Sequence, residues 1–176
     1  MKKWIFVFFF VIISLQLTHA QGKVSKMVAK GNEFFEKMDF KTAESYYDKA
    51  ISLDSNCVEA YIQKSDVFIQ KSDFNNSFHW IQLGLIAAHN ANESSETIAH
   101  IYSIRSFVYF NLNDYKNAIN DLNTAISLND ENSNYYYMRA LIRRINSDLK
   151  GCCADLKKAS SLGLTKADES LTVYCK

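Results

Sequence analysis

The sequence predicts an all-α protein that is built from a repeated helical hairpin. In the stretch 99–132, apolar residues recur at helical spacing, pause at Asn113 and Asp114, and then resume. Two helices that fold back on each other around a turn account for this pattern. The chain also contains no proline and only five glycines, which favours continuous helices because these two residue types are the poorest helix formers.

The hairpin pattern occurs four times along the chain. The acidic residues at the turn are spaced 34, 41 and 34 residues apart, and four further columns keep the same spacing. The acids are Asp39, Asp73, Asp114 and Asp148, and the residues after them are Phe40, Phe74, Tyr115 and Leu149. The small residues are Gly31, Ser65, Ser106 and Ala140; Ala43, Ser77, Ala118 and Cys152; and Ala50, Gly84, Ala125 and Ala159. Five columns in phase indicate a repeat array.

These small and large positions resemble the tetratricopeptide repeat family, whose unit is a 34-residue helical hairpin. The resemblance covers residues 24–162 approximately; the second copy is degenerate, with Ser77 and Gly84 where alanines are usual. It implies a right-handed superhelical array of about four hairpins, with repeats near 24–57, 58–91, 99–132 and 133–164. A short capping helix at 165–175 completes the predicted domain, 21–176.

The first twenty residues have the anatomy of a secretory signal peptide. Basic Lys2 and Lys3 precede an apolar run from Trp4 to Leu17, and Ala20 offers a small residue before a cut that would leave Gln21 first. An uncleaved membrane anchor is the alternative, although the run is shorter than the roughly twenty residues that span a bilayer. We therefore expect an exported protein, periplasmic or secreted, that meets a membrane only if this segment is retained.

Seven extra residues separate the second and third repeats. Seven residues make about two helical turns, so the first helix of the third repeat can begin early, near Ser94 or Ser95, without changing its buried face.

The four cysteines all lie in the part predicted to be exported, where disulfides form. Cys152 occupies a small buried column, and Cys153 points toward the tail, which Thr165 and Asp168 are predicted to start as a capping box. A bond from Cys153 to Cys175 would hold this tail, with Cys152 to Cys175 and free thiols as alternatives. The ending is also similar to that of exported bacterial tetratricopeptide proteins, and this resemblance supports the first pairing.

Nothing in the sequence indicates catalysis, a cofactor or a metal. Adjacent cysteines lack the two-residue spacer of the usual redox pair, and the histidines show no ligand spacing or HExxH motif. A thiol-redox or metal-binding role for Cys152, Cys153 and Cys175 remains the rival hypothesis. After loss of the signal the chain carries 18 basic and 19 acidic residues, a balance that argues against nucleic acid as a partner.

The resemblance implies that the first helices line a concave face that binds a protein or peptide. The predicted contact residues, most of them apolar, are Val28, Asn32, Phe35, Ile62, Asp66, Ile69, Phe107, Phe110, Asn111, Tyr137, Leu141 and Arg144. The family's lysine and asparagine clamp for terminal carboxylates is not supported, because Val28 stands where the lysine would be. The predicted function is that of a non-enzymatic interaction module, a scaffold or assembly adaptor of the bacterial envelope, with self-association as an alternative use of the same face.

Overall fold

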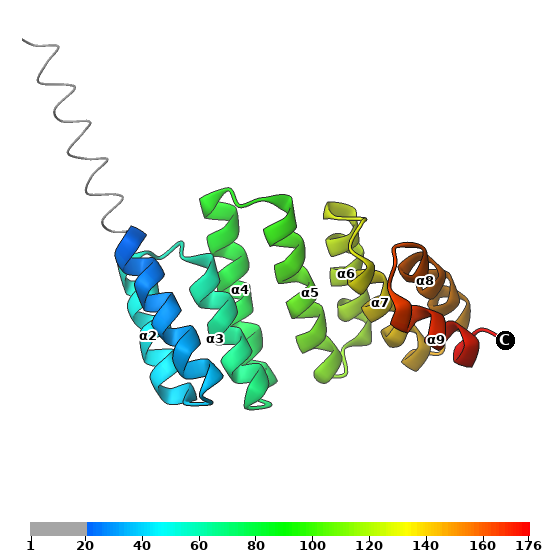
Figure 1. Cartoon of the computed structure of the whole chain (residues 1–176), viewed down its shortest axis with the longest axis horizontal. Helices are drawn as coiled ribbons and strands as arrows, with labels where there is room; N and C mark the ends of the chain where they lie inside the picture. The colour runs from blue at the N-terminus through cyan, green and yellow to red at the C-terminus, as the bar shows by residue number, and fades with distance from the viewer. Residues whose placement is uncertain (1–20) are drawn as a thin grey trace, which may run out of the picture.

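The computed structural model describes residues 21–176, so the predicted signal segment lies outside the described residues. Within that range the chain is all-helical and contains no strand, which confirms the predicted fold class. A first helix covers residues 21–36. The others are α2 (Phe40–Leu53), α3 (Val58–Gln70), α4 (Phe74–Ala91), α5 (Ser95–Asn111), α6 (Tyr115–Leu128), α7 (Ser133–Ile145), α8 (Leu149–Ser161) and α9 (Thr165–Tyr174). They stand side by side in chain order along the array (Figure 1).

At each hairpin turn, the acid of the repeated sequence pattern caps the second helix. Asp39, Asp73, Asp114 and Asp148 are the N-caps of α2, α4, α6 and α8, and each side chain accepts a backbone N–H three residues further on. The residue before each acid has a left-handed backbone, with φ between 58° and 64°. The reversal therefore ends one helix and caps the next within two residues.

The small columns lie where paired helices approach most closely. Ala43, Ala118 and Cys152 are fully buried, as is Ser77 in the degenerate second repeat. The Ser77 hydroxyl lies 2.8 Å from that of Ser65 on α3, so both buried groups are hydrogen-bonded. Serine can replace alanine here because its hydroxyl finds a partner inside the helix pair.

The seven extra residues are shared between two helices. Helix α5 begins early, as predicted, and Ser94 caps it by accepting the N–H of Thr97. Helix α4 is also longer, with 18 residues against 14 in α2, and its C-cap residue Asn92 has a left-handed conformation. The insertion therefore lengthens both helices where they meet, at the C-terminal end of α4 and the N-terminal end of α5, and does not form a long loop of its own.

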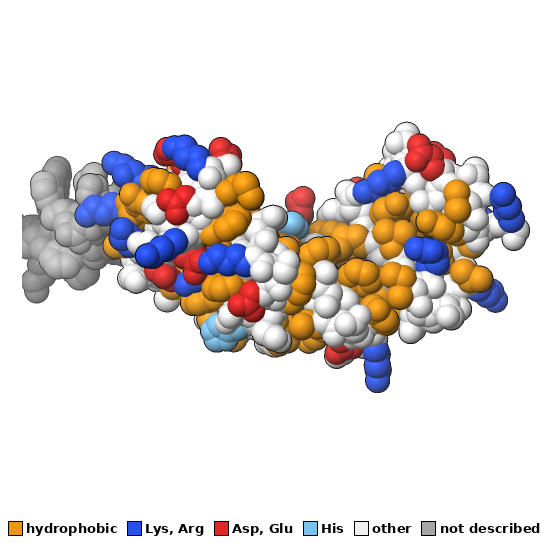
Figure 2. Space-filling model, turned by 90° about the horizontal axis from the view of Figure 1, so that it is seen from below, with side chains coloured by type: hydrophobic (Ala, Val, Ile, Leu, Met, Phe, Trp, Pro, Cys, Tyr) orange, Lys and Arg blue, Asp and Glu red, His pale blue; other side chains and the backbone are white. Residues whose placement is uncertain are grey.

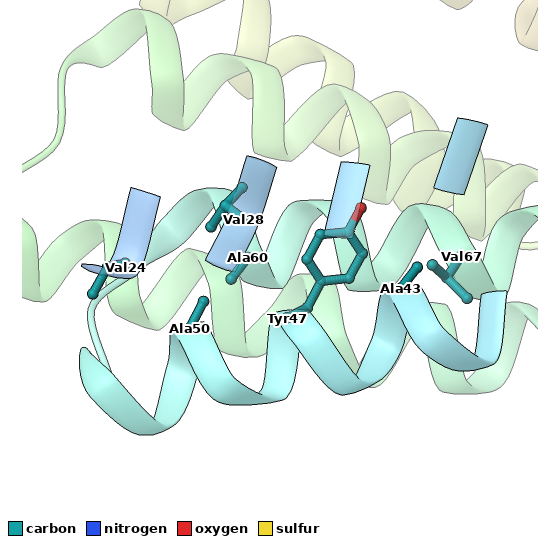
Figure 3. Close-up of a cluster of buried hydrophobic side chains, with 7 residues drawn as sticks. All are labelled: Val24, Val28, Ala43, Tyr47, Ala50, Ala60 and Val67. Carbon is teal, nitrogen blue, oxygen red and sulfur yellow. The ribbon is translucent and has the colours of Figure 1, made fainter. Parts of the chain in front are cut away.

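The core is divided into four clusters, each made by three successive helices. The first cluster joins the helix at 21–36 to α2 and α3, with the fully buried Tyr47 at its centre (Figure 3). The second lies between α3, α4 and α5, the third between α5, α6 and α7, and the fourth between α7, α8 and α9. Helices α3, α5 and α7 each belong to two clusters, so they connect neighbouring hairpins.

The tail helix α9 is bound to the last hairpin through apolar packing and a disulfide. Ala167 is buried in the fourth cluster, and a disulfide joins Cys153 to Cys175. The predicted capping box is wrong: Leu164 is the N-cap residue, and no side chain caps this helix. Asp168 instead accepts a hydrogen bond from the Ser160 hydroxyl on α8, a contact between helices that local spacing could not reveal.

Candidate functional site

Two adjoining hollows on the first-helix side of the array form one groove. The hollow nearer the C-terminus has a volume of about 250 Å³, and its neighbour has about 290 Å³. Phe107 and Met138 line both hollows, so the two adjoin. The groove is lined by Asp66 and Ile69 from α3; Ser103, Ile104, Phe107 and Phe110 from α5; Tyr137, Met138, Leu141 and Ile142 from α7; and Lys166 from α9.

Phe107 is the central exposed ring of this groove. Its side chain is 38% exposed, although helix α5 around it contributes buried residues to two core clusters. Figure 2 shows hydrophobic side chains gathered over the middle of the array on one face, with the outline indented between the two ends. A large apolar ring left open to water in a lined hollow is typical of a contact surface.

Helix α9 forms the C-terminal wall of the groove. The ammonium of Lys166 lies 4.5 Å from the centroid of the Tyr137 ring, a cation–π contact between α9 and α7. Ser170 on α9 lies 3.5 Å from the Tyr137 hydroxyl. The disulfide that fixes α9 therefore also fixes one end of the groove.

Asp66 supplies the single carboxylate among the groove-lining residues. Burial raises its pKa from 3.8 to about 6, and burial is the only cause, so no cation or donor in the described part of the chain offsets it. Asp66 also acts on Tyr47, whose pKa is raised to about 12 by burial first and by the charge of Asp66 second. The N-terminal end of the groove therefore holds an acid without a partner.

Six of the twelve residues predicted for the concave face line the groove. They are Asp66, Ile69, Phe107, Phe110, Tyr137 and Leu141.

Near the N-terminus, the predicted residues take part in internal packing. Val28 is a correction to the prediction: it is 3% exposed in the first core cluster and cannot reach a partner. Asn32 accepts a hydrogen bond of 2.9 Å from the Tyr47 hydroxyl, and the Phe35 ring packs 5.7 Å from that of Phe40. Ile62 packs against the second cluster.

Two further predicted residues, Asn111 and Arg144, make contacts outside the groove. The Asn111 amide donates to the carbonyl of Phe107 one turn earlier on α5. The guanidinium of Arg144 lies 4.4 Å from the centroid of the Tyr174 ring and so helps to hold α9.

Five groove residues were not predicted: Ser103, Ile104, Met138, Ile142 and Lys166. Met138 and Ile142 on α7 each follow a predicted residue in sequence, and Ser103 and Ile104 lie about one turn before Phe107 on α5. A wider predicted face on each helix would have included all four. Lys166 could not be found in this way because nothing in the repeat places the tail.

A column of cations that keeps the repeat spacing was also missed. It binds helices together within each hairpin and does not reach the groove. In the last two hairpins, an arginine of the first helix donates two hydrogen bonds to a carboxylate of the second: Arg105 to Asp121, and Arg139 to Asp155. In the first two, a lysine lies over an aromatic ring at the corresponding place: Lys30 over Tyr46, and Lys64 over Trp80.

Of the cysteines considered for redox or metal chemistry, Cys153 and Cys175 form a disulfide and Cys152 is buried. Within residues 21–176 there is no cluster of three or more potential metal ligands among His, Cys, Asp and Glu. Cys153 and Cys175 are paired, and burial raises the pKa of the Cys57 and Cys152 thiols, which lowers their reactivity. Over the same range, none of the helices is long and apolar enough to cross a membrane.

Comparisons with known proteins agree with the repeat architecture. The tetratricopeptide repeat model matches residues 27–57 and 99–132. The chain is 23% identical over 139 residues to the Hsp70-Hsp90 organising protein of Plasmodium falciparum (isolate 3D7), covering 79% of this chain and 24% of that protein. The chain thus spans about a quarter of the length of the curated relatives it matches.

Solved structures show the same fold. The crystal structure of MamA protein superposes with a TM-score of 0.71 at 20% identity, over 86% of this chain and 80% of that one. The first tetratricopeptide domain of Spaghetti (RPAP3), bound to the HSP90 peptide SRMEEVD, gives a TM-score of 0.63 at 17% identity, over 72% and 94%. At these identities the likeness establishes a tetratricopeptide fold and does not identify a ligand of this chain.

Proposed function

We propose that this tetratricopeptide-repeat array is a non-enzymatic protein-binding module that holds a peptide or a helix of its partner in the groove. The observation that carries this proposal is the largely apolar groove across three repeats, with Phe107 exposed at its centre. Apolar area removed from water contributes about 25 cal/mol per Å², so a bound segment with two or three large apolar side chains is stabilised by burial.

Its similarity to peptide-binding repeat domains supports this proposal. The RPAP3 domain was solved with a peptide bound, and its fold matches this chain over 94% of the RPAP3 domain and 72% of this chain. A groove between first helices suits an amphipathic helix or an extended apolar segment, since both present side chains along one line.

We further propose that the module works outside the cytoplasm, as a scaffold or adaptor of the bacterial envelope. The apolar N-terminal run and the disulfide between Cys153 and Cys175 support an oxidising compartment. N-terminal sequencing of the protein from its native host tests the location. Gln21 as first residue fits export, whereas retention of residues 1–20 in a membrane fraction would favour a tethered adaptor.

Substitution of the central ring tests the groove. Peptides selected from a displayed random ten-residue library should bind the whole chain, and Phe107→Ser should weaken them about tenfold or more because the ring's burial is lost. Ile86→Ser is the matched control, because Ile86 is 56% exposed on α4 and lies outside the groove. Fluorescence anisotropy measures affinity, and circular dichroism checks that helical content is unchanged.

Three outcomes would count against the proposal. Equal binding by Phe107→Ser and the native chain would show that the peptides bind outside the groove. A loss of helix on substitution would make Phe107 part of the core. A dimer that dissociates only in Phe107→Ser would identify a second copy of this chain, rather than a foreign partner, as the occupant.

A further inference from the structure

Asp66 is a carboxylate of the groove whose neighbours there carry no compensating positive charge. It is partly buried on α3, one turn before Ile69, and the hollow around it is completed by Ser103, Ile104, Phe107 and Met138. Not one of these side chains carries a positive charge.

The two buried carboxylates of the described array, Asp121 and Asp155, are paired. Asp121 and Asp155 each accept two hydrogen bonds from an arginine, at 2.6 to 2.9 Å. Lys64, on the same helix as Asp66, pairs instead with Asp48 and covers the Trp80 ring. Among residues 21–176, Asp66 therefore differs from Asp121 and Asp155: it is a partly buried acid whose raised pKa has burial as its only cause, with no cation to offset it.

An acid in apolar surroundings is unfavourable when charged, and a cation brought to it recovers much of that cost. A charge-assisted hydrogen bond is also stronger in a site that excludes water. The binding of a peptide over Ile69 and Phe107 would exclude water from Asp66. A basic side chain on that peptide would then be favoured over a neutral one, and an acidic one would be repelled.

The charge pattern along the groove supports one orientation of such a ligand. The groove has a carboxylate at the α3 end and the ammonium of Lys166 at the α9 end, with apolar residues between them. A ligand complementary to this pattern places its basic residue at the end of the groove where the N-terminal repeats lie.

We propose that Asp66 is a cation subsite of the groove, and that the partner is an apolar peptide segment bearing a lysine or arginine that pairs with this carboxylate. The inference rests on the proposed function, because it assigns a chemistry to the ligand of that same groove.

Selection from a library tests the preference directly. A random ten-residue displayed library is panned against the whole chain and, in parallel, against Asp66→Asn, Asp66→Lys and Asp130→Asn. The last is the matched control, because Asp130 lies exposed in the turn after α6 and its change removes the same charge. Lysine or arginine at one position should be enriched by the native chain and by Asp130→Asn, lost with Asp66→Asn, and replaced by acids with Asp66→Lys.

Affinities of one selected peptide then complete a double-substitution cycle. Changing its basic residue to glutamine should weaken binding to the native chain about 5- to 30-fold, the range expected for about 1 to 2 kcal/mol. The same change should have no effect on binding to Asp66→Asn, and a glutamate peptide should bind Asp66→Lys better than the native chain. Circular dichroism of each variant confirms that the helices are retained.

The outcomes separate this inference from the proposed function. If apolar peptides bind and lose affinity with Phe107→Ser but show no basic preference, the groove stands and the cation subsite is refuted. If no peptide is selected by any variant, the peptide-binding function fails and the subsite fails with it. A basic preference that persists in Asp66→Asn would place the cation elsewhere.

Discussion

At the scale of single residues, Asp66 is an acid whose surroundings oppose its charge. Its pKa is about 6 in the folded protein against 3.8 as the ordinary value, because of burial. A carboxyl group with a raised pKa binds its proton more tightly when folded, so it favours the folded state at low pH. That advantage is lost as pH rises from about 4 through 6.

Asp66→Asn removes the charge and with it this pH dependence. We expect the variant to exceed the native chain in free energy of unfolding by about 1 to 3 kcal/mol at pH 7.5, with a gap smaller by about 1 to 2 kcal/mol at pH 4.5. Urea titrations at the two pH values, with Asp130→Asn as control, measure the gap. A gap that is constant with pH would show that Asp66 titrates normally. If the loss of this charge stabilises the protein, then Asp66 lowers stability in the native chain, as residues kept for function often do.

Residue-level prediction from the sequence succeeded where a repeat column fixes a position, and failed where contacts cross between units. The four capping acids were found because their spacing is strict. The repeat register alone predicts Val28 on the concave face, but this side of the helix at 21–36 is buried against α2 and α3. The partner of each cation in the missed column depends on the opposite helix, so Lys64 and Arg105 make different contacts in the same register.

At the scale of the element, the close approach of the helix at 21–36 to α2 depends on Gly31. A methyl group at Gly31 would overlap the ring of Tyr47, which is fully buried. The same column holds serine or alanine in the other hairpins, where no such ring fills the space. Glycine is therefore required here by packing, although it weakens the helix itself.

Gly31→Ala should be destabilised by about 1 to 2 kcal/mol, because overpacking of the core outweighs the gain in helix propensity. Gly22→Ala on the same helix is the control. An added methyl group there meets no described atom within 4 Å, so stability should rise by up to about 1 kcal/mol. Thermal unfolding followed by circular dichroism gives both values. Equal stabilisation by the two substitutions would mean that the Tyr47 ring can move aside.

The elements were predicted better than the contacts between them. Helix bounds follow from caps and periodicity, and the early start of α5 at Ser95 follows from a seven-residue insertion that preserves its buried face. The groove cannot be predicted from the helix bounds alone, because it is formed where α3, α5 and α7 lie side by side and where α9 adds Lys166 at the end. The position of α9 depends on tertiary contacts, among them the bond of Asp168 to Ser160, for which local sequence carries no signal.

At the scale of the whole molecule, the array is a chain of four small cores joined through shared helices. Each cluster contacts only its neighbours, because α3, α5 and α7 are the helices that belong to two clusters. Stability in such a structure is approximately a sum of units and nearest-neighbour interfaces. A destabilising substitution in a terminal cluster should therefore affect only the helices nearby. The same kind of substitution in an inner cluster should weaken the interface between the N-terminal and C-terminal repeats.

Two core truncations test this organisation. Leu156 and Ile101 are both fully buried, in the terminal cluster around α8 and in the cluster between α3 and α5 respectively. Each change to alanine should cost about 2 to 5 kcal/mol. Under native-state hydrogen exchange, Leu156→Ala should lose protection in α8 and α9 while the helix at 21–36 and α2 keep theirs. Ile101→Ala should lose protection in α3, α4 and α5, and in the helices on both sides.

The groove spans this inner interface, since Asp66 and Phe107 come from α3 and α5. Ile101→Ala should consequently weaken peptide binding more than Leu156→Ala does. A uniform loss of protection in both variants would instead mean that the array unfolds as one cooperative unit.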